Sequence, residues 1–133
     1  MTFSKILIVG CGNMAGAMLQ GWLAGGADPA RFTVADPSPR ALPAGVRHVE
    51  AVPAGEAFDL VLLGVKPQIL DAVAPSVAPA VGPGTVVLSV LAGVELAVLR
   101  RHFAPARAVV RLMPNLAAAL GKSPMALAHE GLD

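Results

Sequence analysis

The sequence is short of cysteine and of charged residues, and each shortage excludes a class of protein. One cysteine cannot form a disulfide within the chain, and 14% charged residues with a net charge of +1 give no basic field for nucleic acid. No targeting segment is visible, which favours a reducing, cytoplasmic location. The three histidines lie in unrelated places and form no His-Asp or Cys-His constellation. We therefore expect a cytoplasmic protein that binds no nucleic acid, and we assign no metal site.

An uninterrupted membrane-spanning run is also missing, although the chain is apolar overall. Hydrophobic residues make up 55% of the sequence, and the mean hydropathy is +0.66. The longest run without charge covers residues 72–94, which is long enough for a span, but prolines and glycines interrupt it. We predict no membrane span. The apolar excess instead favours a surface that a further domain or a second copy of the chain covers.

The most informative stretch is residues 5–19, where an apolar β-branched run breaks at two glycines and continues as a helical pattern. Gly10, Gly12 and Ala15 fit the G-x-G-x-x-G/A fingerprint of a strand, a tight turn and a helix. Gly10 allows the turn, Gly12 lets a pyrophosphate approach the backbone, and Ala15 lets the helix pack on the strand. The free N–H groups of the first helical turn would then bind that pyrophosphate.

Two other interpretations of this stretch stay open. A glycine-rich turn can join a strand to a helix without binding any ligand. The residues from Ile8 to Cys11 also look like a bacterial lipid-attachment site, although about five apolar residues precede the cysteine and a secretory signal has at least roughly 7. We interpret Cys11 as a small filler of the turn, because no basic partner lies beside it.

The rest of the chain alternates buried-strand patterns with helical ones. Strands are predicted at residues 31–35, 59–65, 85–89 and 108–112, with shorter ones at 46–49 and 125–128. Helices are predicted up to residue 24 and over residues 67–78 and 94–103, with a helical turn at 116–120. The predicted fold is a single α/β domain over residues 1–133, with a doubly wound, mostly parallel Rossmann-type sheet.

The end of the second predicted strand carries an acidic residue, Asp36, where such folds hold the adenosine ribose. Its carboxylate would accept hydrogen bonds from the ribose hydroxyls and repel a 2′-phosphate, which favours NAD. Ser38 and Arg40 favour NADP instead, because a hydroxyl and a guanidinium can bind its 2′-phosphate. Asp36 could instead be a turn or capping residue before Pro37.

Three further loops follow predicted strands, at residues 65–68, 89–93 and 113–115. In an open parallel sheet, ligands bind outside the carboxyl ends of the strands, so all three loops are placed to contact a cofactor. Lys66 and Pro67 belong to the first loop. The lysine could equally be a solvated residue ahead of a helix that begins with the proline.

Four motifs, in order along the chain, resemble pyrroline-5-carboxylate reductase, the enzyme of the last step of proline synthesis. They are IVGCGNM at residues 8–14, VKPQ at 65–68, LS with AGV between 88 and 94, and RLMPN at 111–115. The resemblance implies a pyrophosphate site at Gly10, Cys11, Gly12, Asn13 and Met14. It also implies that Val65, Lys66 and Pro67 line the cofactor site, with Ala92 and Asn115 near the nicotinamide.

The implied reaction is hydride transfer from NADPH, or from NADH, to the C=N carbon of 1-pyrroline-5-carboxylate. The sequence departs from the family where Leu116-Ala117 and Ser123-Pro124 stand in place of its usual residues. Such reductases also carry a second, helical domain that forms the dimer and binds the substrate carboxylate. We expect that domain to be absent from residues 1–133, and the activity of these residues alone to be low.

Other functions remain compatible with the sequence. A related NADP oxidoreductase, of the F420-dependent or β-hydroxyacid dehydrogenase type, begins with a similar glycine turn, although the VKPQ and MPN motifs argue against both. A non-catalytic nucleotide-binding or interaction module is the alternative from another class. The chain could also be a piece cut from a longer reductase.

Overall fold

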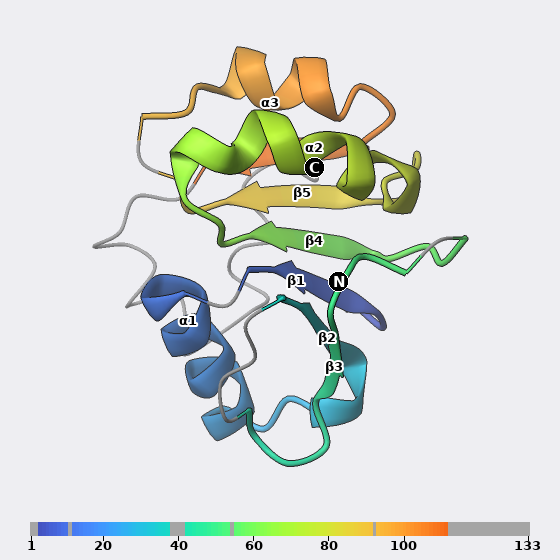
Figure 1. The fold of residues 1–133 in the computed structure, drawn as a ribbon. Coiled ribbons are helices and arrows are strands. Elements are labelled where there is room, and N and C mark those ends of the chain that lie inside the picture. Colours follow the sequence, from blue (N-terminus) through green and yellow to red (C-terminus); the bar gives the residue numbers. More distant parts are fainter. Residues whose placement is uncertain (1–2, 11, 38–41, 54, 92, 112–133) are drawn as a thin grey trace.

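The computed structural model describes residues 3–10, 12–37, 42–53, 55–91 and 93–111. Its centre is a sheet of six strands in the order β3-β2-β1-β4-β5-β6, and every pair of neighbours is parallel (Figure 1). The strands are β1 (Ile6–Val9), β2 (Phe32–Ala35), β3 (Arg47–Val49), β4 (Leu60–Leu63), β5 (Val86–Ser89) and β6 (Ala108–Arg111). The order reverses between β1 and β4, and in open parallel sheets ligands bind beyond the carboxyl ends of the strands at such a point.

Helical segments connect the strands, as parallel pairing requires. The α-helices are α1 (Asn13–Ala24), α2 (Leu70–Val77) and α3 (Leu96–His102), and the 3₁₀ turns are η1 (Pro29–Arg31), η2 (Pro67–Ile69) and η3 (Ala78–Ala80). Within the described ranges, no helix is both long and apolar enough to cross a membrane.

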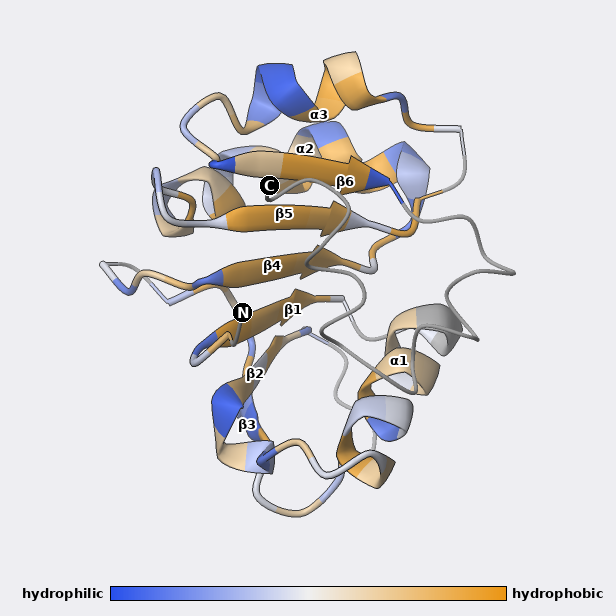
Figure 2. Ribbon diagram, turned by 180° about the vertical axis from the view of Figure 1, so that it is seen from behind, coloured by the Kyte–Doolittle hydropathy of each residue, from blue (hydrophilic) through white to orange (hydrophobic). Residues whose placement is uncertain are grey.

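The two faces of the sheet pack against different helices, which makes the fold doubly wound. On one face, alternate strand residues such as Ile8 and Leu62 join Met18 and Trp22 of α1 in one buried cluster. On the other face, Val61 and its neighbours pack with residues of α2 and α3. Because both faces are covered at the centre of the sheet, β1 and β4 are apolar throughout, whereas the edge strand β3 is largely hydrophilic, as the hydropathy colours of Figure 2 show.

The predicted fold class is confirmed, and most element boundaries differ by one to three residues. The first helix ends at Ala24 as predicted, where Gly25 forms the C-cap and Gly26 follows with φ of 103°. The helix predicted over residues 67–78 is a 3₁₀ turn followed by α2, because Pro67 and the residues after it form the tighter turn first. The elements predicted at 116–120 and 125–128 lie outside the described residues.

Polar contacts hold the amino ends of the strands. The Asp59 carboxylate accepts the backbone N–H groups of Ser4 and Lys5 at 2.8 and 3.0 Å, so the starts of β4 and β1 are tied together. Glu56 pairs with both Lys5 and Arg47, and hydrogen bonds from these two cations lower the pKa of its carboxyl. This contact therefore stabilises the fold at neutral pH and is lost in acid as Glu56 becomes protonated.

Candidate functional site

The site begins at the turn after β1, where Gly10 has φ of 76°. Its N–H donates to the carbonyl of Ala35 at 2.9 Å, so the turn is joined to the end of β2. A Cβ atom at Gly10 would lie 2.7 Å from Cγ1 of Val65 and 3.0 Å from the backbone nitrogen of Val65. Glycine is required here for two reasons, the left-handed backbone and the contact with the residues after β4.

A second glycine, Gly64, completes this contact from the other strand. Its N–H donates to the carbonyl of Val9 at 2.8 Å. A Cβ atom at Gly64 would overlap the carbonyl oxygen of Gly10 and would lie 2.6 Å from Cβ of Ala15. Sequence reasoning placed Gly64 within a strand and gave it no role. The available signal was a glycine that ends a buried apolar run beside a predicted glycine turn.

Gly12 differs from these two, because the protein itself leaves room for a side chain there. Its φ is −76°, which any residue adopts, and among the described residues an added Cβ would approach only the carbonyl oxygen of Gly64, at 3.5 Å. Gly12 is the N-cap of α1 and, as a glycine, has no side chain that could cap the helix; the first turn holds no acidic residue. An uncapped helix start behind a residue without a side chain suits an anion such as a pyrophosphate.

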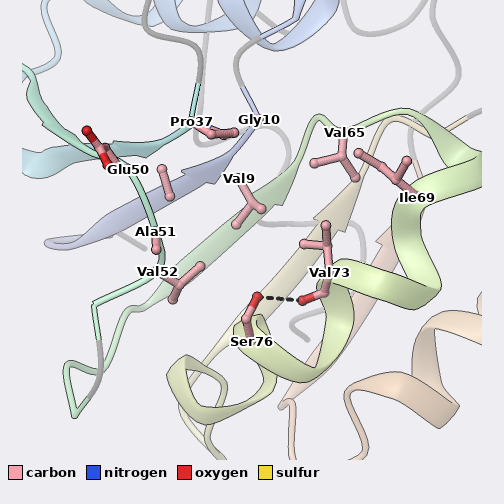
Figure 3. A pocket seen from close by; sticks show the side chains of 11 residues that line it. Val9, Gly10, Pro37, Glu50, Ala51, Val52, Val65, Ile69, Val73 and Ser76 are labelled. Atoms are coloured by element: carbon pink, nitrogen blue, oxygen red, sulfur yellow. Dashed lines mark hydrogen bonds between the residues drawn. The ribbon is translucent and has the colours of Figure 1, made fainter.

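A cavity of about 200 Å³ lies beside this turn, on the face of the sheet that α2 covers (Figure 3). Its walls come from the ends of β1 and β2, the loop after β3, and the segment from β4 into α2. The lining residues are Val9, Gly10, Ala35, Pro37, Glu50, Ala51, Val52, Val65, Ile69, Val73 and Ser76. Most of them are apolar, and the volume suits one flat ring system better than a whole drug-sized ligand.

The wall formed by α2 and the turn before it presents a row of side chains at helical spacing, Ile69, Val73 and Ser76 (Figure 3). The Ser76 hydroxyl donates to the carbonyl of Val73 at 2.8 Å, so this polar group is already bonded within the helix. Ile69 is 42% exposed, which is unusual for a large apolar side chain in this fold. Sequence reasoning missed this wall, because its apolar spacing also fits a helix that packs only on the sheet.

Asp36 lies directly between two residues that line the cavity, Ala35 and Pro37. It is half-buried, and its N–H donates to the carbonyl of Val49 at 3.0 Å. This bond to the end of β3 holds Asp36 beside the cavity, at the position where dinucleotide-binding folds of this type carry the residue that binds the ribose.

The structure brings together Gly10, Gly12, Asp36 and Val65 among the predicted site residues. Lys66 and Pro67 follow Val65 and are exposed, at the start of η2. Asn13 and Met14 form the first turn of α1. The remaining predicted residues lie outside the described ranges; they are Cys11, Ser38, Arg40, Ala92 and Asn115.

The two histidines in the described part of the chain contact protein groups. His48 Nε2 lies 2.9 Å from the carbonyl oxygen of Asp36, and His102 Nε2 lies 2.9 Å from Oδ1 of Asp71. The second contact joins α3 to α2. Within the described ranges, no three His, Cys, Asp or Glu residues form a cluster that could hold a metal ion.

The strand order and the glycine turn define a Rossmann-type α/β domain, of the class whose members bind dinucleotides at this edge of the sheet. Residues 5–93 match the family model described as NADP oxidoreductase, coenzyme F420-dependent. The chain belongs to this family of oxidoreductases, which is the class that the sequence predicted.

The relatives of the chain include pyrroline-5-carboxylate reductases, so the predicted resemblance is confirmed. The reductase of Pseudomonas aeruginosa is 37% identical over 126 residues, which are 90% of this chain and 46% of the relative. The structure of the Coxiella burnetii reductase matches with a TM-score of 0.69 at 25% identity, over 83% of this chain and 43% of that one. The Plasmodium falciparum reductase with NADP bound matches in fold, with a TM-score of 0.62 at 17% identity over 74% and 37% of the two chains. The chain spans about half the length of these relatives.

The contact at Gly10 gives a prediction with a matched control. Gly55 has the same φ of 76°, but an added Cβ would meet nothing within 4 Å. Alanine at either position costs about 1–2 kcal/mol through the left-handed backbone, and Gly10→Ala adds about 1–3 kcal/mol through the contact with Val65. Denaturant unfolding should therefore show a larger loss for Gly10→Ala than for Gly55→Ala. Equal losses would show that the turn is not tightly packed.

The exposed wall of the cavity gives a second prediction. Ile69→Ala should weaken dinucleotide binding about 5- to 10-fold, because a bound base would lose apolar contact, while stability changes little at a partly exposed position. Leu96→Ala is the control, since Leu96 is 47% exposed on α3 and does not line the cavity. The measurement is a binding titration with thermal unfolding of each variant. Equal affinity in both variants would exclude the cavity as the base site.

Proposed function

We propose that residues 1–133 form the NADP(H)-binding part of a reductase that converts 1-pyrroline-5-carboxylate to proline. The observation that carries this proposal is the uncapped start of α1 behind Gly12, next to an apolar cavity at the carboxyl ends of the strands. The similarity to pyrroline-5-carboxylate reductases over most of the chain supports the choice of substrate. The single cysteine favours the cytoplasm as the location.

Each part of the site has a separate task in this proposal. The backbone around Gly12 and the first turn of α1 bind the pyrophosphate, and the cavity between Val9, Val52 and Ile69 holds the adenine. Asp36 faces the ribose next to that base. NADPH, when bound, supplies the hydride. These residues then anchor the adenosine half of the cofactor, so that the loops after β4 and β5 lie beside its other half.

The choice between NADP and NAD depends on groups near the ribose that favour different cofactors. A carboxylate at position 36 accepts hydrogen bonds from ribose hydroxyls and repels a 2′-phosphate. Ser38 and Arg40 supply the groups that a 2′-phosphate needs. We propose NADP(H) as the cofactor, with NAD(H) as the weaker alternative, and the family's description as an NADP oxidoreductase supports this order.

A reductase that uses coenzyme F420 is the second candidate, because the matching family model carries that description. The VKPQ and MPN motifs favour the imine reductase. Assays of NADPH oxidation with 1-pyrroline-5-carboxylate, and of NADP reduction with reduced F420, separate the two candidates.

The role of Gly12 can be tested without disturbing the fold. Gly12→Val should reduce NADPH binding at least 10-fold, because the side chain would occupy the space of the pyrophosphate. The variant should still fold, because an added Cβ makes only an ordinary contact with Gly64, although valine is a poorer N-cap than glycine and should lower the stability by about 1 kcal/mol. A fluorescence titration of NADPH measures the binding. Unchanged affinity in a folded variant would contradict the assignment of the turn.

The activity can be tested with the 133-residue chain itself. It covers 46% of the Pseudomonas aeruginosa relative, so we expect NADPH binding with little reduction of 1-pyrroline-5-carboxylate. Adding the carboxyl-terminal part of that relative should raise the rate of NADPH oxidation. Binding without turnover in the mixture would favour a non-catalytic nucleotide-binding module, and full turnover by the 133 residues alone would refute the division of tasks.

A further inference from the structure

The residue at the rim of the cavity, Asp36, is held by β3 through both its backbone N–H and its backbone carbonyl. Its N–H donates to the carbonyl of Val49 at 3.0 Å, and its carbonyl oxygen lies 2.9 Å from Nε2 of His48. A carbonyl oxygen only accepts, so Nε2 of His48 carries the proton and donates. The first bond continues the pairing of β2 with β3, whereas the second depends on one side chain.

His48 reaches Asp36 from the side of the sheet opposite to the cavity. It pairs in register with Val34, whose side chain belongs to the core cluster on the α1 face. Side chains of register partners lie on the same face, so His48 is on that face as well. The cavity is on the α2 face, and His48 is not among its lining residues. Replacing His48 therefore leaves the walls of the base site intact.

We propose that His48 is a positioning residue that controls the discrimination between NADH and NADPH by fixing the backbone of Asp36. This inference rests on the proposed function. A carboxylate distinguishes a ribose hydroxyl from a 2′-phosphate only if its position is fixed relative to the sugar. His48 fixes that position at the residue that follows β2, just before Pro37.

The test measures dissociation constants for NADH and NADPH with the 133-residue chain. His48→Leu removes the donor and retains bulk, and it should shift the ratio of the two constants toward NADPH by roughly 3- to 10-fold, mainly through weaker NADH binding. His48→Thr, too short to reach the carbonyl and well suited to a strand, should act in the same direction. His48→Gln keeps an N–H donor and should restore most of the discrimination.

A double-variant cycle shows whether His48 acts through Asp36. Asp36→Ser should itself shift the ratio toward NADPH, and His48→Leu should then cause no further shift. An equal shift in both backgrounds, or a lower melting temperature with an unchanged ratio, would overturn the positioning role while the proposed function stands. Failure of the unaltered chain to bind either dinucleotide would overturn the proposed function and this inference together.

Discussion

The structure depends on the close approach of three small residues, Gly10, Ala15 and Gly64. They come from the turn after β1, the first helix and the end of β4, and a Cβ atom on either glycine would collide with its neighbours. Their contact packs β1, the turn after it and α1 closely against the end of β4, at the point where the strand order reverses. The start of α1 is thereby placed at the carboxyl edge of the sheet, which is the position that the proposed pyrophosphate site requires.

The two edges of the sheet differ in how their polar groups are used. At the amino edge, Asp59 accepts two backbone N–H groups and Glu56 pairs with two cations, so polar groups there are used within the protein. At the carboxyl edge, the N-cap residue Gly12 has no side chain to bond the helix start, and Ile69 leaves apolar surface exposed. The polar groups of the amino edge are thus bonded within the protein, whereas the carboxyl edge offers N–H donors and apolar side chains. Such an edge suits a ligand with a charged part and a flat part.

The sheet and its turn could be predicted from the sequence because their signals are local. Strands covered on both faces give continuous apolar runs, and a left-handed glycine between such a run and a helix has few alternatives. The cavity could not be predicted, because its walls meet only after β1, β3 and α2 assemble. Gly64 was missed for the same reason, since its partner atoms are 49 and 54 residues away, in Ala15 and Gly10.

In the proposed function, the described residues bind and position the nucleotide rather than transfer protons. Both of their histidines contact other groups of the protein, one the backbone of Asp36 and the other Asp71. Reduction of an activated C=N bond needs a hydride donor held close to the acceptor more than it needs a strong acid or base. A domain that fixes the nucleotide can therefore contribute to catalysis by position alone. In the proposed function, the substrate would be held by groups other than those that bind the nucleotide.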